Sequence, residues 1–294
     1  MYTTLISAPQ LQALLTSAQP VMVFDCSFEL MEPGKGDQQY LQAHIPGAVR
    51  ADLDRHLSAA KTATDSASGG RHPLPSLETF ATWLASVGFD NTMQAVVYDR
   101  QGTNYCGRLW WMLKWAGHEP VAVLDGGLQA WQASGGATHS SAGDSPSNTT
   151  GPTGSPSNFI LTPAKTKLIA TKAVANNLGR PAQTLLDARG APRFKGEVEP
   201  LDPVAGHIPG ALNRPFNLNL DNEGRFKPAD VLRSEFDALL GGRDPATVVH
   251  HCGSGVSAVP NIIAMEVAGL GRAALYAGSW SEWCSDPARP VAQG

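Results

Sequence analysis

The sequence predicts an α/β protein built from two tandem copies of one domain, each a mainly parallel sheet flanked by helices. Short apolar runs alternate with helical segments along the chain, which is the pattern of strands joined by helical crossovers. Several motifs also occur twice in the same order, and a long stretch rich in Ser, Gly, Thr and Pro separates the two sets. A length of 294 residues fits two domains better than one.

The repeat is clearest at the start of each copy. The apolar run Val21–Asp25 is followed by the segment His44–Ala48, and the run Thr184–Asp187 is followed by the same five residue types at His207–Ala211. We therefore expect a first domain over residues 1–135, a linker over residues 136–158 and a second domain over residues 159–294. The helices expected in the two copies are Leu77–Val87, Gly107–Ala116, Ala229–Leu240 and Ser257–Ala268.

Composition and charge exclude several classes of protein. The chain carries 22 Lys and Arg against 26 Asp and Glu, so it has no basic excess that would attract nucleic acid. Its apolar runs fall well short of the ~18 residues that a membrane span needs. The N-terminal segment lacks the positive charge and continuous apolar core of a signal peptide, so we expect a cytoplasmic protein without nucleic-acid or membrane partners.

Four cysteines are present, at Cys26, Cys106, Cys252 and Cys284, and no two of them form a C-x-x-C pair. This spacing argues against a disulfide framework and against a zinc site. The adjacent His250, His251 and Cys252 resemble a ligand cluster, but successive side chains at a strand end point to opposite faces and cannot converge on one ion. We expect neither a metal nor an organic cofactor.

Cys252 is the strongest candidate for a reactive residue. It follows an apolar strand and precedes a glycine-containing loop and a helix with Pro260 in its first turn. Backbone N–H groups that turn inward in such a loop, together with the helix N-terminus, stabilise a thiolate, which is the nucleophilic form of a cysteine. A phosphatase of this loop length would need an arginine where this chain has Ala258, so phosphate-ester chemistry lacks its bidentate cation.

The loop Cys252–Ser257 resembles the active-site loop of the rhodanese-like sulfurtransferases, in the form found in 3-mercaptopyruvate sulfurtransferases. The segments Asp187–Arg189, His207–Ala211 and Gly278–Trp283 resemble other signatures of that family, in the same order. The resemblance implies that the Cys252 thiolate takes a sulfur atom from a small anionic donor and passes it on from a persulfide. It also implies that the donor is bound by Gly253, Gly255, Val256 and Ser257.

The identity of the donor depends on charge near the sulfur. Relatives that prefer thiosulfate carry Arg or Lys directly after the cysteine, so Gly253 and Ser254 favour 3-mercaptopyruvate. Arg193 falls where the family places an arginine for the substrate carboxylate. Members of the family that use mercaptopyruvate have a second substrate arginine at the position of Leu201 in this chain. A thiosulfate sulfurtransferase with the same cysteine, or a non-catalytic binding module, therefore remains an alternative.

Some members of the family are thought to use a Ser-His-Asp relay, and the matching residues here are Ser254, His72 and Asp54. In the first copy Asp99 stands in the place of the nucleophile, so we expect that copy to be inactive, because a carboxylate cannot form a persulfide. The acceptor of the sulfur is expected to be a small thiol, thioredoxin or cyanide.

Overall fold

Two parallel sheets, one in each of two compact units, form the cores of the protein. The computed structural model describes residues 1–60, 62–141 and 156–294, so residues 142–155 of the expected linker lie outside the described part. The first unit contains residues 1–59, 75–165 and 222–225. The second unit contains residues 60–74, 166–221 and 226–294. The segment 60–74 thus precedes most of the first unit in sequence but belongs to the second unit.

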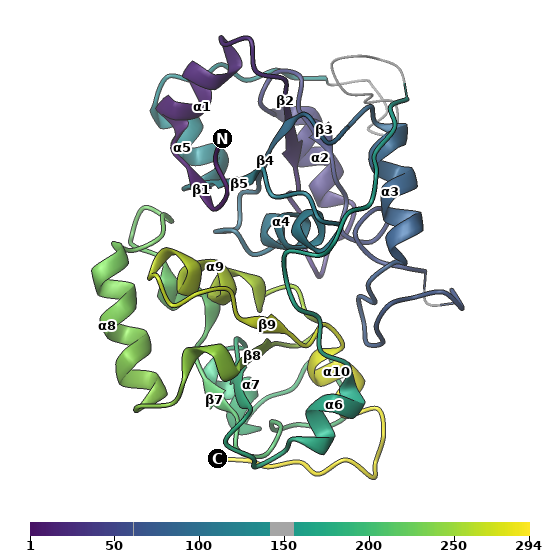
Figure 1. Ribbon diagram of the computed structural model, residues 1–294, viewed down its shortest axis with the longest axis vertical. Coiled ribbons are helices and arrows are strands. Elements are labelled where there is room, and N and C mark those ends of the chain that lie inside the picture. Colours follow the sequence, from purple (N-terminus) through teal and green to yellow (C-terminus); the bar gives the residue numbers. More distant parts are fainter. Residues whose placement is uncertain (61, 142–155) are drawn as a thin grey trace. The chain divides into compact units, whose positions relative to one another are not determined.

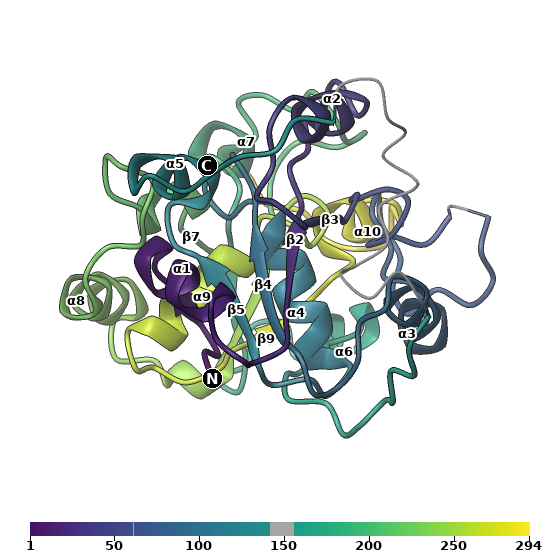
Figure 2. The same ribbon diagram turned by 90° about the horizontal axis from the view of Figure 1, so that it is seen from above.

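The first unit contains a five-stranded sheet in the order β1-β5-β4-β2-β3, and all of its strand pairs are parallel. Figure 2 shows β5, β4 and β2 side by side. Helix α4 packs on β4 and β5, while α1 and α5 pack on each other. The elements are β1 Leu5–Ile6, α1 Ala8–Leu15, β2 Val21–Asp25, α2 Lys35–Gln42, β3 Val49–Arg50, α3 Leu77–Ser86, β4 Gln94–Tyr98, α4 Cys106–Trp115, β5 Val121–Leu124 and α5 Gly127–Ala133.

The second unit contains a four-stranded parallel sheet in the order β7-β6-β8-β9. Strands β7, β8 and β9 of this sheet are labelled in Figure 1. Helix α9 packs on β8, β9 and α8. On β8, Val249 joins an apolar cluster with Trp280 and Trp283. The elements are α6 Thr171–Asn176, β6 Thr184–Asp187, α7 Ala191–Lys195, β7 Leu212–Asn213, η2 Phe216–Asn219, α8 Ala229–Leu240, η3 Pro245–Thr247, β8 Val248–His251, α9 Val259–Val267, β9 Ala274–Leu275 and α10 Ser279–Trp283.

The predicted fold class is confirmed, because each copy is a parallel sheet with helices packed on it. Local sequence explains many of the boundaries. Ser7 and Gln10 form a capping box at the start of α1, and Gly241 ends α8 in a left-handed conformation. β8 is buried along its whole length, as expected for a strand of a parallel sheet that is covered on both faces.

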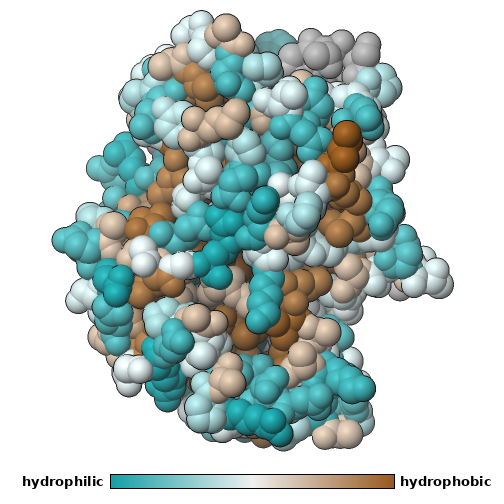
Figure 3. All heavy atoms as spheres, in the orientation of Figure 1, coloured by the Kyte–Doolittle hydropathy of each residue, from teal (hydrophilic) through white to brown (hydrophobic). Residues whose placement is uncertain are grey.

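Hydrophobic residues show on the visible face only as separate patches among hydrophilic ones (Figure 3). Four tryptophans, Trp110, Trp111, Trp280 and Trp283, are fully buried. No helix in the described part of the chain is both long and apolar enough to cross a bilayer.

Candidate active site

Cys252 lies directly after β8, at the carboxyl edge of the second sheet, where ligands of open α/β sheets bind. Its side chain is 2% exposed. The backbone N–H of Cys252 donates to Ser279 Oγ at 3.1 Å, and its carbonyl accepts from the N–H of Trp280 at 3.0 Å. A third bond, from Ser281 N–H to the Gly253 carbonyl at 2.9 Å, also ties the loop to the start of α10. The loop that carries the thiol is therefore held in place by the start of α10, a segment that is distant from it in sequence.

Gly255 is required by the shape of this loop. Its φ angle is +76°, a left-handed conformation that residues other than glycine adopt only at a cost in free energy. A Cβ atom at this position would also lie 2.2 Å from the carbonyl oxygen of Ala277. The chain bends sharply here, and α9 begins only at Val259, with Pro260 in its first turn as predicted.

The first copy shows what a loop of this kind can bind. Asp99, which aligns with Cys252, is buried, and its carboxylate lies within the turn that leads into α4. Each carboxylate oxygen accepts two backbone N–H groups at distances of 2.8 to 3.0 Å. The donors are the N–H groups of Gln101, Thr103, Tyr105 and Cys106. In the first copy the chain thus fills its own loop of inward-pointing N–H groups with the carboxylate of Asp99.

Two of the three predicted relay residues are in contact. The Nδ1 atom of His72 lies 2.7 Å from the Oγ atom of Ser254, and both side chains are buried. His72 belongs to the segment 60–74, which is part of the second unit. Asp54 is exposed and lies in the first unit, where its backbone N–H donates to Asp52 Oδ1.

Arg193 is on the short helix α7 and is held by two acidic side chains. Its Nη2 atom donates to Glu199 Oε1 at 2.7 Å and to Asp202 Oδ2 at 3.1 Å, and its Nε atom donates to Glu199 Oε2 at 3.2 Å. Glu199 also accepts the backbone N–H groups of Leu201 and Asp202. These contacts point the remaining nitrogen, Nη1, toward Gly253, where it lies 3.4 Å from the position that a Cβ atom would take.

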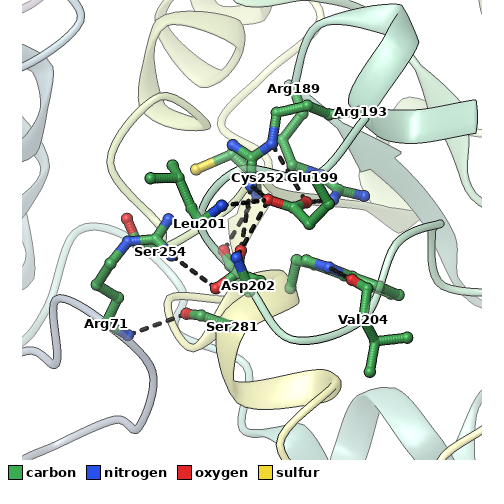
Figure 4. Close-up of polar contacts among 12 residues, drawn as sticks. Arg71, Arg189, Arg193, Glu199, Leu201, Asp202, Val204, Cys252, Ser254 and Ser281 are labelled. Atoms are coloured by element: carbon green, nitrogen blue, oxygen red, sulfur yellow. Dashed lines mark hydrogen bonds and ion pairs between the residues drawn. The ribbon is translucent and has the colours of Figure 1, made fainter. Parts of the chain in front are cut away.

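A second guanidinium, that of Arg71, also lies next to Gly253. Arg71 donates from Nη1 to Asp202 Oδ1 at 2.6 Å, and its backbone N–H donates to Ser281 Oγ (Figure 4). Its Nη2 atom is 3.0 Å from the position of a Cβ atom on Gly253. Burial raises the pKa of Asp202 above its usual range and Glu199 adds to this effect, whereas Arg71 and Arg193 oppose it.

The two histidines before the cysteine diverge, as the strand geometry predicts. The Nε2 atom of His250 contacts the sulfur of Met265 on α9, whereas the Nδ1 atom of His251 lies 3.8 Å from Asp187 Oδ2. No group of three or more His, Cys, Asp or Glu side chains in the described ranges is arranged to hold a metal ion.

The structure brings together Cys252, the glycine loop, Ser254, His72 and Arg193, all named from sequence. Val256 is buried in the loop and its carbonyl accepts the N–H of Val259, while Ser257 is half-buried. Sequence reasoning missed four residues: Arg71, Glu199, Asp202 and Ser279. Arg71 directly precedes His72, and this adjacency is the one signal that pointed to it.

The sequence pattern of the rhodanese-like domain matches residues 7–134 and 170–286, which is most of both copies. The chain belongs to the rhodanese-like family. It is 45% identical over 293 residues to a Pseudomonas aeruginosa protein named "Probable 3-mercaptopyruvate sulfurtransferase", with 99% of this chain and 98% of that protein covered. It is 38% identical to the mitochondrial "Thiosulfate/3-mercaptopyruvate sulfurtransferase 1" of Arabidopsis thaliana, with 86% and 69% covered.

Among solved structures, this rhodanese-like chain resembles the 3-mercaptopyruvate sulfotransferase SseA from Escherichia coli. The TM-score is 0.74 at 30% sequence identity, and the match covers 95% of this chain and all of the other. The expected family and enzyme class are therefore confirmed, and the protein is a sulfurtransferase of the rhodanese-like family.

Proposed function

We propose that this sulfurtransferase moves a sulfur atom from 3-mercaptopyruvate to a nucleophilic acceptor, through a persulfide on Cys252. The observation that carries the proposal is the position of Cys252 at a strand end, in a glycine-containing loop. The residue after Cys252, Gly253, faces the guanidinium of Arg193. A thiol and a carboxylate-binding cation thus lie within the reach of one small α-keto acid.

In the first half-reaction the Cys252 thiolate attacks the sulfur of the donor. A sulfur–sulfur bond forms, and the carbon–sulfur bond breaks with its electron pair remaining on carbon. The leaving group is the enolate of pyruvate, which takes up the proton of the donor thiol to give pyruvate. The products are a Cys252 persulfide anion and pyruvate, so atoms and charge balance without an external oxidant.

In the second half-reaction an acceptor thiolate attacks the outer sulfur, and the persulfide bond breaks to restore the Cys252 thiolate. The persulfide is an anion, and backbone N–H groups of a loop of this type stabilise such a charge without reorganising. The Asp99 carboxylate in the aligned loop of the first copy, with its four N–H donors, supports this assignment.

A role in proton transfer is proposed for Ser254 and His72. Their hydrogen bond of 2.7 Å is within the range needed for proton transfer between a hydroxyl and an imidazole. Because the enolate is a much stronger base than a thiolate, a proton held near the leaving carbon assists departure. The role of Asp54 as third member of the relay stays a prediction.

The nucleophile is assigned to the second copy, over the proposed domain of residues 159–294. The first copy, residues 1–135, is proposed to form no persulfide because it has Asp99 in place of the cysteine, and its part in the reaction is limited to His72, which contacts Ser254. The acceptor, whether a small thiol, thioredoxin or cyanide, and the cytoplasmic location also stay predictions.

The test is a comparison of kcat/KM for 3-mercaptopyruvate and for thiosulfate on one preparation, together with the intact mass of the protein after donor treatment. We expect a preference for 3-mercaptopyruvate and the gain of one sulfur atom. Cys252→Ser should abolish both the mass gain and turnover, and Cys284→Ser serves as the control because that thiol is also buried and its pKa is raised by burial.

Each outcome has a separate meaning. A preference for thiosulfate would replace the proposed donor while leaving Cys252 as the nucleophile. Turnover that survives Cys252→Ser would exclude the persulfide mechanism. The absence of added sulfur with either donor would favour a binding module over an enzyme of this specificity.

A further inference from the structure

Residues 67–74, here called the strap, carry His72 to the candidate active site. The backbone N–H of Ala67 donates to the Leu74 carbonyl at 2.9 Å, and the N–H of Leu74 donates to Ser68 Oγ at 2.9 Å, so the strap is closed on itself. His72 is 6% exposed, and Leu74 is fully buried. The place of the imidazole therefore depends on what ties this loop to the rest of the second unit.

Arg71 ties the strap to the second unit through two hydrogen bonds that fix different parts of it. The bond from Nη1 to Asp202 Oδ1, at 2.6 Å, acts at the end of a long side chain with several rotatable bonds. The backbone N–H donates to Ser281 Oγ at 2.9 Å and so fixes the main chain one residue before His72 (Figure 4). Because His72 precedes Pro73, its own backbone is restricted to extended conformations. The bond to Ser281 thus sets the point from which the imidazole side chain starts.

The strap comes close enough to Ser281 because glycine stands before Arg71. The φ angle of Gly70 is +89°, and a Cβ atom there would lie 2.5 Å from the Gly278 carbonyl oxygen and 2.8 Å from Ser281 Oγ. The Ser281 hydroxyl donates to the same Gly278 carbonyl at 3.3 Å, so the lone pairs of its oxygen are left to accept the N–H of Arg71. Both the glycine and the hydroxyl are therefore needed for this contact.

Ser281 also holds the segment that carries the partner of His72. Its backbone N–H donates to the Gly253 carbonyl at 2.9 Å, and the next residue, Ser254, has its Oγ atom 2.7 Å from His72 Nδ1. One residue of α10 thus binds the loop through its main chain and the strap through its side chain. Loss of the hydroxyl alone would release the strap and leave the loop around Cys252 bound to α10.

We propose that Ser281 is a positioning residue that sets the distance between His72 and Ser254 through the backbone N–H of Arg71. This inference rests on the proposed function, in which His72 and Ser254 transfer a proton. Ser281 acts on the reaction through His72, so its hydroxyl matters for turnover only while the imidazole is present.

The experiment is a double-mutant cycle on steady-state turnover. Ser281→Ala should lower kcat for 3-mercaptopyruvate about three- to ten-fold, the effect of one hydrogen bond, and change KM less than about two-fold. In a His72→Ala background the same substitution should change kcat less than about two-fold, because the group that it positions is gone. Turnover of thiosulfate, whose leaving group is already a stable anion, should change less than that of 3-mercaptopyruvate.

Ser285→Ala is the matched control, because Ser285 is an exposed serine just after α10 whose hydroxyl donates to the Glu282 carbonyl at 2.8 Å. We expect it to turn over both donors at the rate of the unsubstituted protein. Urea denaturation of each variant checks that the fold is retained.

A full kcat in Ser281→Ala, an equal loss in the His72→Ala background, or an equal loss with thiosulfate would overturn the positioning role. The same holds if His72→Ala itself leaves turnover of 3-mercaptopyruvate unchanged. Failure of the unsubstituted protein to gain sulfur from 3-mercaptopyruvate, measured by intact mass, would overturn the proposed function and this inference with it, so the two failures are distinguishable.

Discussion

Replacing Gly255 by alanine tests whether the loop around Cys252 requires glycine at this position. The φ angle of +76° places a side chain in the left-handed region, at a cost of about 1–2 kcal/mol. The new Cβ atom would lie 2.2 Å from the Ala277 carbonyl oxygen, a contact that only a shift of the backbone can relieve. Overpacking of this kind costs about 1–3 kcal/mol. The free energy of unfolding should therefore fall by about 2–5 kcal/mol.

Gly269→Ala provides a matched control in the same unit. Its φ angle is +68°, but no atom lies within 4 Å of the position of its Cβ, so only the conformational cost should appear. Stability is measured by urea denaturation, and persulfide formation on Cys252 by intact mass. The steric argument is refuted if the two variants lose stability equally, or if Gly255→Ala loads sulfur as fast as the unsubstituted protein.

Two further predictions concern proton transfer and pH. Ser254→Ala and His72→Ala should slow turnover of 3-mercaptopyruvate more than that of thiosulfate, whose leaving group is already a stable anion; equal losses in steady-state assays would indicate a positioning role only. Burial lowers the pKa of His250 to about 3, so the folded protein stays unprotonated at His250 when the unfolded chain binds a proton. The contribution of neutral His250 to the free energy of unfolding is fully present above pH 6.5, the approximate pKa of histidine in the unfolded chain. It is lost as the pH falls toward 3, and about 2 kcal/mol of it is lost at pH 5. His250→Leu should flatten this dependence in denaturation curves, whereas an unchanged slope would contradict it.

Elements governed by local rules were predicted well. The strands Val21–Asp25 and Thr184–Asp187 and the helix Ala229–Leu240 have the bounds expected from hydrophobic periodicity. The helix expected from Ser257 begins instead at Val259, because the chain is still bending around the thiol at that point. The helix expected from Gly107 begins one residue earlier, where the N–H of Cys106 donates to Asp99.

The candidate site was predicted in part. Cys252 and its glycine loop follow from a strand-to-helix junction that is visible in the sequence, and Arg193 followed from the resemblance to a family. The contacts that orient these residues were not predictable. Ser279 binds the N–H of Cys252 across 27 positions, and Arg71 binds Asp202 across 131 positions. Neither pairing leaves a periodic or compositional signal.

The sequence by itself determined the duplication, the alternation of strands and helices, and the nucleophile at the end of a strand. These properties depend on residue types and backbone preferences that act over a few positions. Only the tertiary structure decided that residues 60–74 belong to the second unit, and that Arg71 and Arg193 share one carboxylate, Asp202. A charged group in the interior takes the partner that packing brings within reach, because burial without a partner is costly, and that choice is made by the whole fold.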